Sequence, residues 1–298
     1  MPISPSFIFV RTGSFKRQPD EVVRRGRAVT TRAGLTGLLH RERIVLGSSL
    51  ALLFILAAIY TVAGTGMEMS ALEMTRMAHM RDMPASHPPG DWTASFVILV
   101  FAMWWVMMMA MMLPSVAPAV LLYAALLGRT RDAGSAGSHA AVFLSGYLVA
   151  WAGFSVLAML AQWGLEAAGV VSAGMMTLID TTAGGLLLLA AGLFQFTRLK
   201  SVCLATCRSP AAFIARHHRR GALGALRLGA LHGAYCVGCC WALMVLLFVG
   251  GVMNLYWIVG LTLLVAVEKL VPHGDRVARI VGAGLALWGA AIIITGLA

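Results

Sequence analysis

The feature that most constrains the fold of this chain is a succession of apolar runs, each close to the length that crosses a lipid bilayer. A transmembrane helix needs about 20 apolar residues, because the hydrocarbon core is about 30 Å thick and each helical residue rises about 1.5 Å. Hydrophobic residues make up 59% of the 298-residue chain and charged residues only 12%. The runs are continuous rather than alternating, so they predict helices and argue against a membrane β-barrel. We therefore predict an all-α, polytopic membrane protein.

About seven transmembrane helices are predicted, and they form a single helical domain over residues 44–298 that follows a basic tail, residues 1–43. The predicted spans are 44–63, 94–113, 139–164, 173–196, 222–251, 253–267 and 276 to the C-terminus. The second run stays apolar as far as Leu127, and Pro114 or Pro118 is expected to kink or break that helix.

Basic residues indicate the orientation of these helices. If seven helices cross the membrane, most Lys and Arg residues fall on one side. They are nine in 1–43, two in 128–138, seven in 198–227 and three in 268–279. Only Arg76 and Arg81 fall on the other side. By the positive-inside rule the N-terminus is cytoplasmic, and we predict a multi-pass protein of the bacterial inner (cytoplasmic) membrane. The rule also accounts for the net charge of +11, so the bilayer is the expected partner and nucleic acid is not.

Candidate metal ligands concentrate in LHGAYCVGCCW, residues 231–241, within the fifth run. His232, Cys236, Cys239 and Cys240 lie within about 100° of arc on one helix face. Thiolate and imidazole are the ligands that Zn(II) and Cu(I) select. The alternative is a packing face, because free cysteine buries well and glycine lets helices approach closely. Four such side chains on one face favour a soft-metal or redox site.

Further ligands are predicted next to this helix. Cys203 and Cys207 follow the fourth run and share one helix face, and their short connection to the fifth run predicts neighbouring helices. All five cysteines then lie in the cytoplasmic half, where disulfides are disfavoured. Glu268, at the end of the sixth run, can add an oxygen ligand. The alternatives are two unrelated exposed thiols and an interfacial Glu268–Lys269 pair.

Methionine is the second soft-ligand feature, with eighteen in the chain. The second run contains MWWVMMMAMMLP, in which five methionines fall in two adjoining rows on the helix. The loop before this run holds six more, together with two histidines. Thioethers bind Cu(I), although methionine is also an adaptable apolar filler and the loop can form an amphipathic surface helix. The weaker metal candidates are Met107, Met111, Met112, His79 and His87.

The blocks MWWVMMMAMMLP, LKSVCLATCRSP and HGAYCVGCCWALM, followed by GVMN and VEKL, resemble the signature blocks of a family of bacterial integral membrane proteins. That family is described as predicted metal-binding, with a domain of unknown function. The resemblance covers about residues 44–298 and leaves the basic tail outside. It implies metal binding at the matching positions Cys203, Cys207, His232, Cys236, Cys239, Cys240 and Glu268. It implies no substrate and no reaction.

Two functions remain open at this point, and a third reading is a structural subunit whose thiols only pack. The first is a metal-handling protein that binds, transfers or transports a metal ion, with copper favoured and zinc or iron as alternatives. Its partners would be a soluble metal-donor protein or other membrane subunits. Proton-coupled transport is disfavoured, because Asp180 and Glu268 are the only carboxylates predicted inside the membrane that could carry protons. The second is a metal- or dithiol-dependent redox enzyme, or a subunit of a larger complex, with an apolar pocket lined by Trp104, Trp105, Trp241 and Tyr235.

Overall fold

The computed structural model describes residues 44–65, 69–80, 88–129 and 133–297. Within these residues every regular element is helical, and the only strand-like pairing is an isolated bridge between Val171 and Leu178. Contacts divide the chain between Glu42 and Arg43. The basic tail lies outside the described residues, and all the described helices belong to the second unit, Arg43–Ala298.

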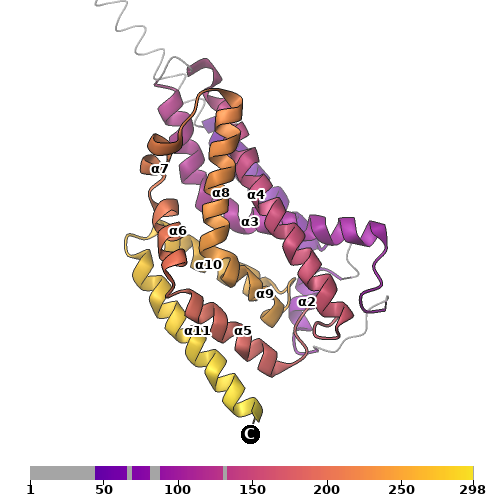
Figure 1. The fold of residues 1–298 in the computed structure, drawn as a ribbon. Coiled ribbons are helices and arrows are strands. Elements are labelled where there is room, and N and C mark those ends of the chain that lie inside the picture. The colour runs from indigo at the N-terminus through magenta and orange to yellow at the C-terminus, as the bar shows by residue number, and fades with distance from the viewer. Residues whose placement is uncertain (1–43, 66–68, 81–87, 130–132, 298) are drawn as a thin grey trace, which may run out of the picture. The chain divides into compact units, whose positions relative to one another are not determined.

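Figure 1 shows the helices, which follow one another in this order along the chain. An apolar helix, Ile44–Ala63, comes first. After it come α2 (Ala71–Arg76), α3 (Ala94–Leu127), the 3-10 turn η1 (Ala133–Ser135), α4 (Ala136–Ala167), α5 (Thr181–Phe194), α6 (Arg198–Arg208), α7 (Pro210–His217), α8 (Gly221–Val245), α9 (Leu247–Gly250), α10 (Leu255–Leu270) and α11 (Gly274–Leu297).

Five of these helical segments are long and apolar enough to cross a membrane: Ile44–Ala63, α3, α4, Gly221–Gly250 and α11. A sixth crossing results if α5 and α6, which meet at a bend of 63°, count as one broken span. The predicted fourth span is therefore shorter than expected, because α5 begins only at Thr181. The predicted sixth span corresponds to α10, whose 16 residues extend about 24 Å. The total of seven crossings and the cytoplasmic N-terminus stay predictions.

The second predicted span is longer than expected, because α3 runs through both of its prolines as one helix of 34 residues. Each proline removes one backbone donor, yet helical structure resumes after it. Buried side chains continue along α3 to Leu127, so packing on both sides of the prolines holds the helix together. Of the kink or break predicted at Pro114 or Pro118, the break does not occur.

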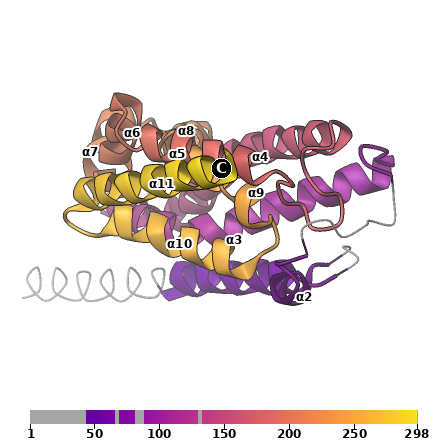
Figure 2. The ribbon, with the colours of Figure 1, turned by 90° about the horizontal axis from the view of Figure 1, so that it is seen from below.

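Two helix pairs form the closest packing in the unit, and glycines make both possible. A Cβ atom added to Gly229 of α8 would lie 1.8 Å from the backbone oxygen of Phe143 in α4, and one added to Gly146 would lie 2.1 Å from Leu226 O. The backbones of α4 and α8 are therefore in direct contact, as small residues allow between apolar helices. The second pair, α5 and α11, meets in the same way at Gly192 and Gly289. Figure 2 shows these pairs with α3 and α10 beside them.

Candidate metal site

Helix α6 carries two cysteines to the side of α8. The 63° bend after α5 turns α6 away from the α5 axis, and Thr197 caps the new helix by accepting a hydrogen bond from Lys200 N. The approach to α8 is close, because a Cβ atom on Gly238 would lie 2.9 Å from the Cys203 sulfur. One turn further on, the Cys207 and Cys239 sulfurs lie 4.0 Å apart. The expected contact between the CxxxC segment and the cysteine-rich helix is present.

Cys236 is the centre of the cluster. Its sulfur lies 2.9 Å from the Lys269 ammonium and 2.9 Å from the Tyr147 hydroxyl. Its carbonyl oxygen accepts the Cys239 thiol at 3.1 Å and the Cys240 thiol at 2.8 Å. These thiols are buried, and all five cysteines of the chain are free. One sulfur of this group of reduced thiols, that of Cys236, thus contacts a buried ammonium.

The thiols are not arranged as a ready-made multidentate site. Among the described residues no group of three or more His, Cys, Asp or Glu side chains is placed to hold a metal ion. Two sulfurs on opposite sides of one metal would lie roughly 4.6 Å apart, twice a metal–sulfur distance of about 2.3 Å. The Cys207–Cys239 separation is 4.0 Å, so a small rotamer adjustment suits this pair to two-coordinate binding.

His232 lies one helical turn before Cys236 and is only 4% exposed. Its ring centroid is 5.1 Å from that of Phe213 and 6.1 Å from that of Tyr147. Its Nδ1 atom is buried without a hydrogen-bond partner. Because an unpaired buried polar atom is costly, this nitrogen is available to a ligand. No direct contact between His232 and a cysteine sulfur is present among the described residues.

Glu268 was predicted as an oxygen ligand, but its carboxylate is engaged elsewhere. One carboxylate oxygen lies 2.5 Å from the Lys200 ammonium, and both side chains are 1% exposed. The other oxygen accepts a hydrogen bond from Gln195 Nε2 at 3.3 Å. The pair links α10 to α6 in the interior rather than at an interface. The adjacent Lys269 contacts the thiols instead.

Sequence reasoning missed Lys200, Lys269 and Tyr147. Counting basic residues by side treats each lysine as an exposed charge, whereas both lysines are buried. Lys200 precedes Cys203 by three residues and Cys207 by seven. This spacing puts the three side chains on one face of α6, so the sequence could have predicted that Lys200 faces the same way as the cysteines. Lys269 ends an apolar run, where a charge is by default a candidate functional group. For Tyr147 no sequence signal was available, because its position depends on the α4–α8 contact.

The methionines of α3 face the interior and lead to this cluster. Met107, Met111 and Met112 are almost completely buried, and the Met112 sulfur lies 4.0 Å from the Lys269 ammonium. His79 is exposed and follows α2, in which Met74 is buried. His87 lies outside the described residues.

Glu166 is a buried carboxylate that the sequence pattern did not reveal. Its oxygens accept hydrogen bonds from Trp92 Nε1 at 2.8 Å and Gln162 Nε2 at 3.2 Å. Gln162 in turn accepts from Trp104 Nε1 at 2.8 Å. The prediction counted Asp180 and Glu268 as the intramembrane carboxylates, and Glu166 is a further carboxylate that is buried in α4. Asp180 is an exposed cap of α5 that accepts a hydrogen bond from Thr182 N.

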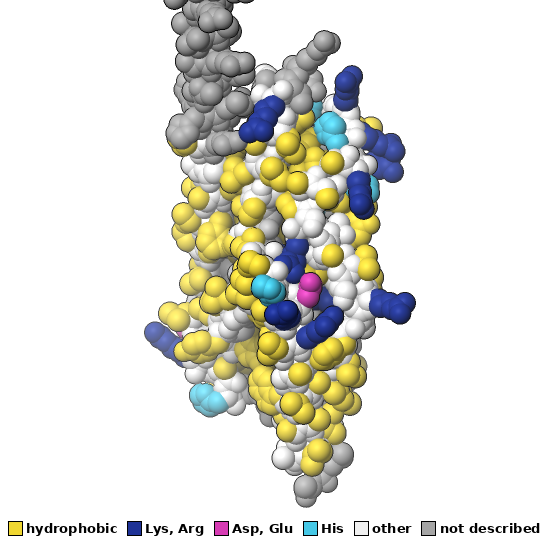
Figure 3. Space-filling view, turned by 90° about the vertical axis from the view of Figure 1, so that its left-hand side faces the viewer, with side chains coloured by type: hydrophobic (Ala, Val, Ile, Leu, Met, Phe, Trp, Pro, Cys, Tyr) yellow, Lys and Arg dark blue, Asp and Glu magenta, His cyan; other side chains and the backbone are white. Residues whose placement is uncertain are grey.

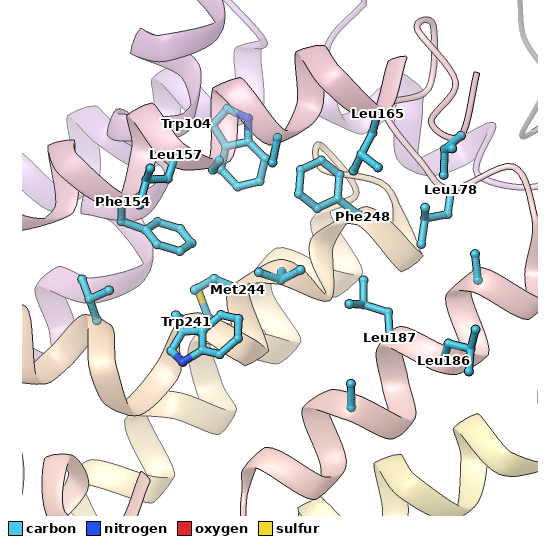
Figure 4. Close-up of a pocket in the computed structure, with 17 residues that line it drawn as sticks. Trp104, Phe154, Leu157, Leu165, Leu178, Leu186, Leu187, Trp241, Met244 and Phe248 are labelled. Atoms are coloured by element: carbon cyan, nitrogen blue, oxygen red, sulfur yellow. The ribbon is translucent and has the colours of Figure 1, made fainter. Parts of the chain in front are cut away.

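A cavity of about 680 Å³ lies between α3, α4, α5 and α8 and is almost entirely apolar (Figure 4). Trp104, Trp241 and Phe248 contribute aromatic walls. Of the four residues expected to line an apolar pocket, Trp104 and Trp241 do so. Trp105 and Tyr235 do not, and the Trp105 indole donates to Leu148 O.

The surface beside α6 and the first turns of α11 carries charged side chains, whereas the surface along the rest of α11 is mostly apolar. Figure 3 shows Lys and Arg side chains in the upper and middle parts of this face, and mostly apolar side chains below. Arg208, at the end of α6, pairs with Asp275 at 3.2 Å and donates to Val271 O at 2.9 Å. The end of α6 is thus fastened to the turn between α10 and α11.

These features define a class: an α-helical protein with several helices suited to a membrane and a buried cluster of reduced thiols. Residues 101–292 match the model of the PpoB2 family, which is described as a copper chaperone. The chain belongs to this family. The match begins in α3 and ends in α11, so it includes the whole thiol cluster. Comparison with curated proteins and with solved structures finds no match.

Proposed function

We propose that this chain is an integral membrane copper chaperone that binds Cu(I) in the thiol cluster and passes it to a protein partner. The observation that carries the proposal is the approach of Cys207 and Cys239, 4.0 Å apart on two different helices. Soft thiolates are preferred ligands of Cu(I). Two of them from separate helices can bind the ion, and separating those helices releases it.

The remaining ligands extend this pair. Cys236 and Cys240 are fully buried next to Cys239 and supply alternative sulfurs. His232 supplies an imidazole nitrogen that has no partner at Nδ1. Cys203 is a weaker candidate, because its sulfur packs against the backbone at Gly238. Glu268 is weaker still, because Lys200 and Gln195 already engage it.

The buried methionines of α3 provide a route to the cluster. From Met103 to Met112 they extend about 13 Å along the helix, and Met112 ends beside Lys269 and Cys236. Thioethers bind Cu(I) without deprotonation, so they suit transient sites. Copper entering at the end of the bundle where α3 begins passes from thioether to thiolate, with increasing affinity.

The partner is a protein that meets the cluster from the α6 side. Cys207 is half-buried whereas its neighbours on α8 are buried, so it is the first thiol that a partner reaches. The predicted orientation places this face in the cytoplasm of a bacterium and the bundle in the inner membrane. A soluble metal carrier or another membrane subunit then exchanges the ion by ligand replacement.

The test is a Cu(I) titration of the purified full-length protein in detergent, in competition with a chromogenic Cu(I) chelator. We expect one tightly bound ion per chain, with affinity reduced by about tenfold or more in Cys207→Ser or Cys239→Ser, because two-coordinate binding loses half its ligands. The matched control is Cys203→Ser, which removes a thiol from the same helix and should retain binding. Equal affinity in all three variants would exclude the proposed pair.

A second function, dithiol redox chemistry on an apolar substrate, is favoured by the same thiol pair and by the cavity beside Trp241. Cys207 and Cys239 can form a disulfide after a small movement. Trapping the thiols in cells with an alkylating reagent separates the functions. A disulfide that forms and is reduced again as growth conditions change would favour the redox enzyme. Thiols that stay reduced under all conditions would favour the chaperone.

A further inference from the structure

Lys269 is a buried lysine whose shortest hydrogen bond in the described part of the chain is to the Cys236 sulfur. Its side chain is 8% exposed, and its ammonium lies 2.9 Å from Cys236 Sγ and 3.4 Å from Ser115 Oγ. Neither ion pair among the described residues includes it. A buried charge without a partner is costly. The lysine therefore favours one negative charge on the thiols.

The neighbouring charges do not alter this balance. Lys200 and Glu268 form a closed pair, because each engages the other at 1% exposure. Gln195, which also contacts Glu268, is neutral. The cluster without its thiolates therefore carries a net charge of +1, which belongs to Lys269.

We propose that Lys269 is the counter-charge of the metal-loaded cluster and makes it selective for a monovalent soft ion. This inference rests on the proposed function of Cu(I) binding at the same thiols. Two thiolates and one Cu(I) ion carry a net charge of −1, which the ammonium of Lys269 neutralises. The loaded cluster is then neutral inside an apolar bundle, where unbalanced charge is most costly.

A divalent ion does not reach the same balance with the ligands at hand. Zn(II) with two thiolates is neutral, so Lys269 would leave a charge of +1 in the interior. Zn(II) needs a third thiolate to balance the lysine, and it prefers four ligands in a tetrahedron. No group of three such ligands is arranged around one point in the described residues. Charge and geometry therefore both disfavour zinc.

Lys269 is thus a specificity-determining residue that need not touch the metal. A purely structural role is the competing explanation, because its hydrogen bonds join α10 to Ser115 of α3 and Cys236 of α8. That role predicts reduced stability for any substitution. It predicts no change in the ratio between Cu(I) and Zn(II) affinity.

The experiment measures Cu(I) and Zn(II) affinities of the full-length protein in detergent by chelator competition. We expect Lys269→Met to lower the Cu(I) affinity by about tenfold or more and to raise the relative affinity for Zn(II). Lys269→Arg, which keeps the charge, should retain most of the preference. Arg276→Met is the control, since it removes one positive charge at an exposed position of α11 that lies outside the proposed ligands.

The outcomes are distinguishable. If the wild-type protein binds no Cu(I), the proposed function itself fails. If it binds Cu(I) and Lys269→Met leaves the Cu(I)-to-Zn(II) affinity ratio unchanged, only the role of Lys269 fails. Lys269→Gln provides the same neutral test in a side chain that still donates a hydrogen bond, in case the methionine variant does not fold.

Discussion

At the scale of single residues, the hydrogen-bonded string that ends at Glu166 is polarised in one direction. Trp104 donates to Gln162, and Gln162 and Trp92 both donate to Glu166. If the Gln162 amide were rotated by half a turn, its NH₂ group would face the Trp104 indole N–H, and two hydrogen-bond donors would then point at each other. The side chain at position 166 must therefore accept a hydrogen bond at each of its two terminal atoms, and a carboxylate can do so.

We predict that Glu166→Gln destabilises the protein by about 1–3 kcal/mol, because the new NH₂ group faces a donor that it cannot satisfy. The measurement is the midpoint of thermal unfolding in detergent. Asp180→Asn is the matched control, since it makes the same chemical change at an exposed cap where asparagine is equally suitable. A midpoint unaffected in both variants would show that the string does not stabilise the fold.

At the scale of the helix, the contact between α4 and α8 decides where the cluster forms. Gly146, Gly229 and Gly233 let the two backbones touch, and this contact places Tyr147 beside Cys236.

The short helix α2 is a second element with well-defined local contacts. Its Ser70 and Glu73 form a capping box, and the hydrogen bond from Ser70 N is the main reason why the pKa of Glu73 lies below its usual range. Thr75 of α2 accepts from Leu255 N at the start of α10.

We predict that Gly229→Val separates α4 from α8 and costs about 3 kcal/mol, because its side chain would overlap the backbone of Phe143. Gly153→Val is the control, since a side chain on this α4 glycine meets nothing within 4 Å. Thermal unfolding in detergent reports the stability. Reactivity of Cys236 toward a thiol reagent should rise in the Gly229 variant alone, and equal reactivity in both variants would contradict this role of the glycine.

The sequence predicted some elements well, and the failures have a common cause. Run length and hydropathy were sufficient for Ile44–Ala63, α3, α4, α8 and α11, because a long apolar helix is determined by its own residues. The short connector after Cys207 was sufficient to place α6 beside α8. Lys200, Lys269 and Glu166 were missed, because a charge near the end of an apolar run has the same sequence pattern whether it is solvated or paired inside.

At the scale of the whole unit, the basic loops share one side of the membrane only in the predicted arrangement of seven crossings. The seven-crossing arrangement requires α10 to cross, although its 16 residues are fewer than the about 20 that usually span a bilayer. Its C-terminal end carries Glu268 and Lys269, both of which are buried by neighbouring helices. Protein rather than lipid surrounds that end, so a short helix is sufficient there.

We predict that reporter domains inserted after Val252 and after His273 fall on opposite sides of the membrane, the second on the cytoplasmic side. Accessibility of each reporter in intact cells is the measurement. Insertions at Gly66 and Gly221 provide the reference for outside and inside. Reporters on the same side after Val252 and His273 would mean that α10 does not cross.

The bend between α5 and α6 has a consequence for how tightly the cargo is held. Cys207 lies on α6, which is joined to α5 through three residues and is held at its other end by the Arg208 contacts with Asp275 and Val271 O. A tilt of α6 about the joint therefore requires these contacts to break, whereas Cys239 lies on α8, whose backbone is in direct contact with α4. The thiol of Cys207 lies roughly 14 Å along α6 from that joint, so a tilt of about 10° moves it by about 2 Å. Such a movement opens the gap between the two sulfurs beyond the reach of one metal ion. In the proposed copper site, retention and release would correspond to two angles of this joint, and a partner that displaces the Arg208 contacts could release the ion without entering the bundle.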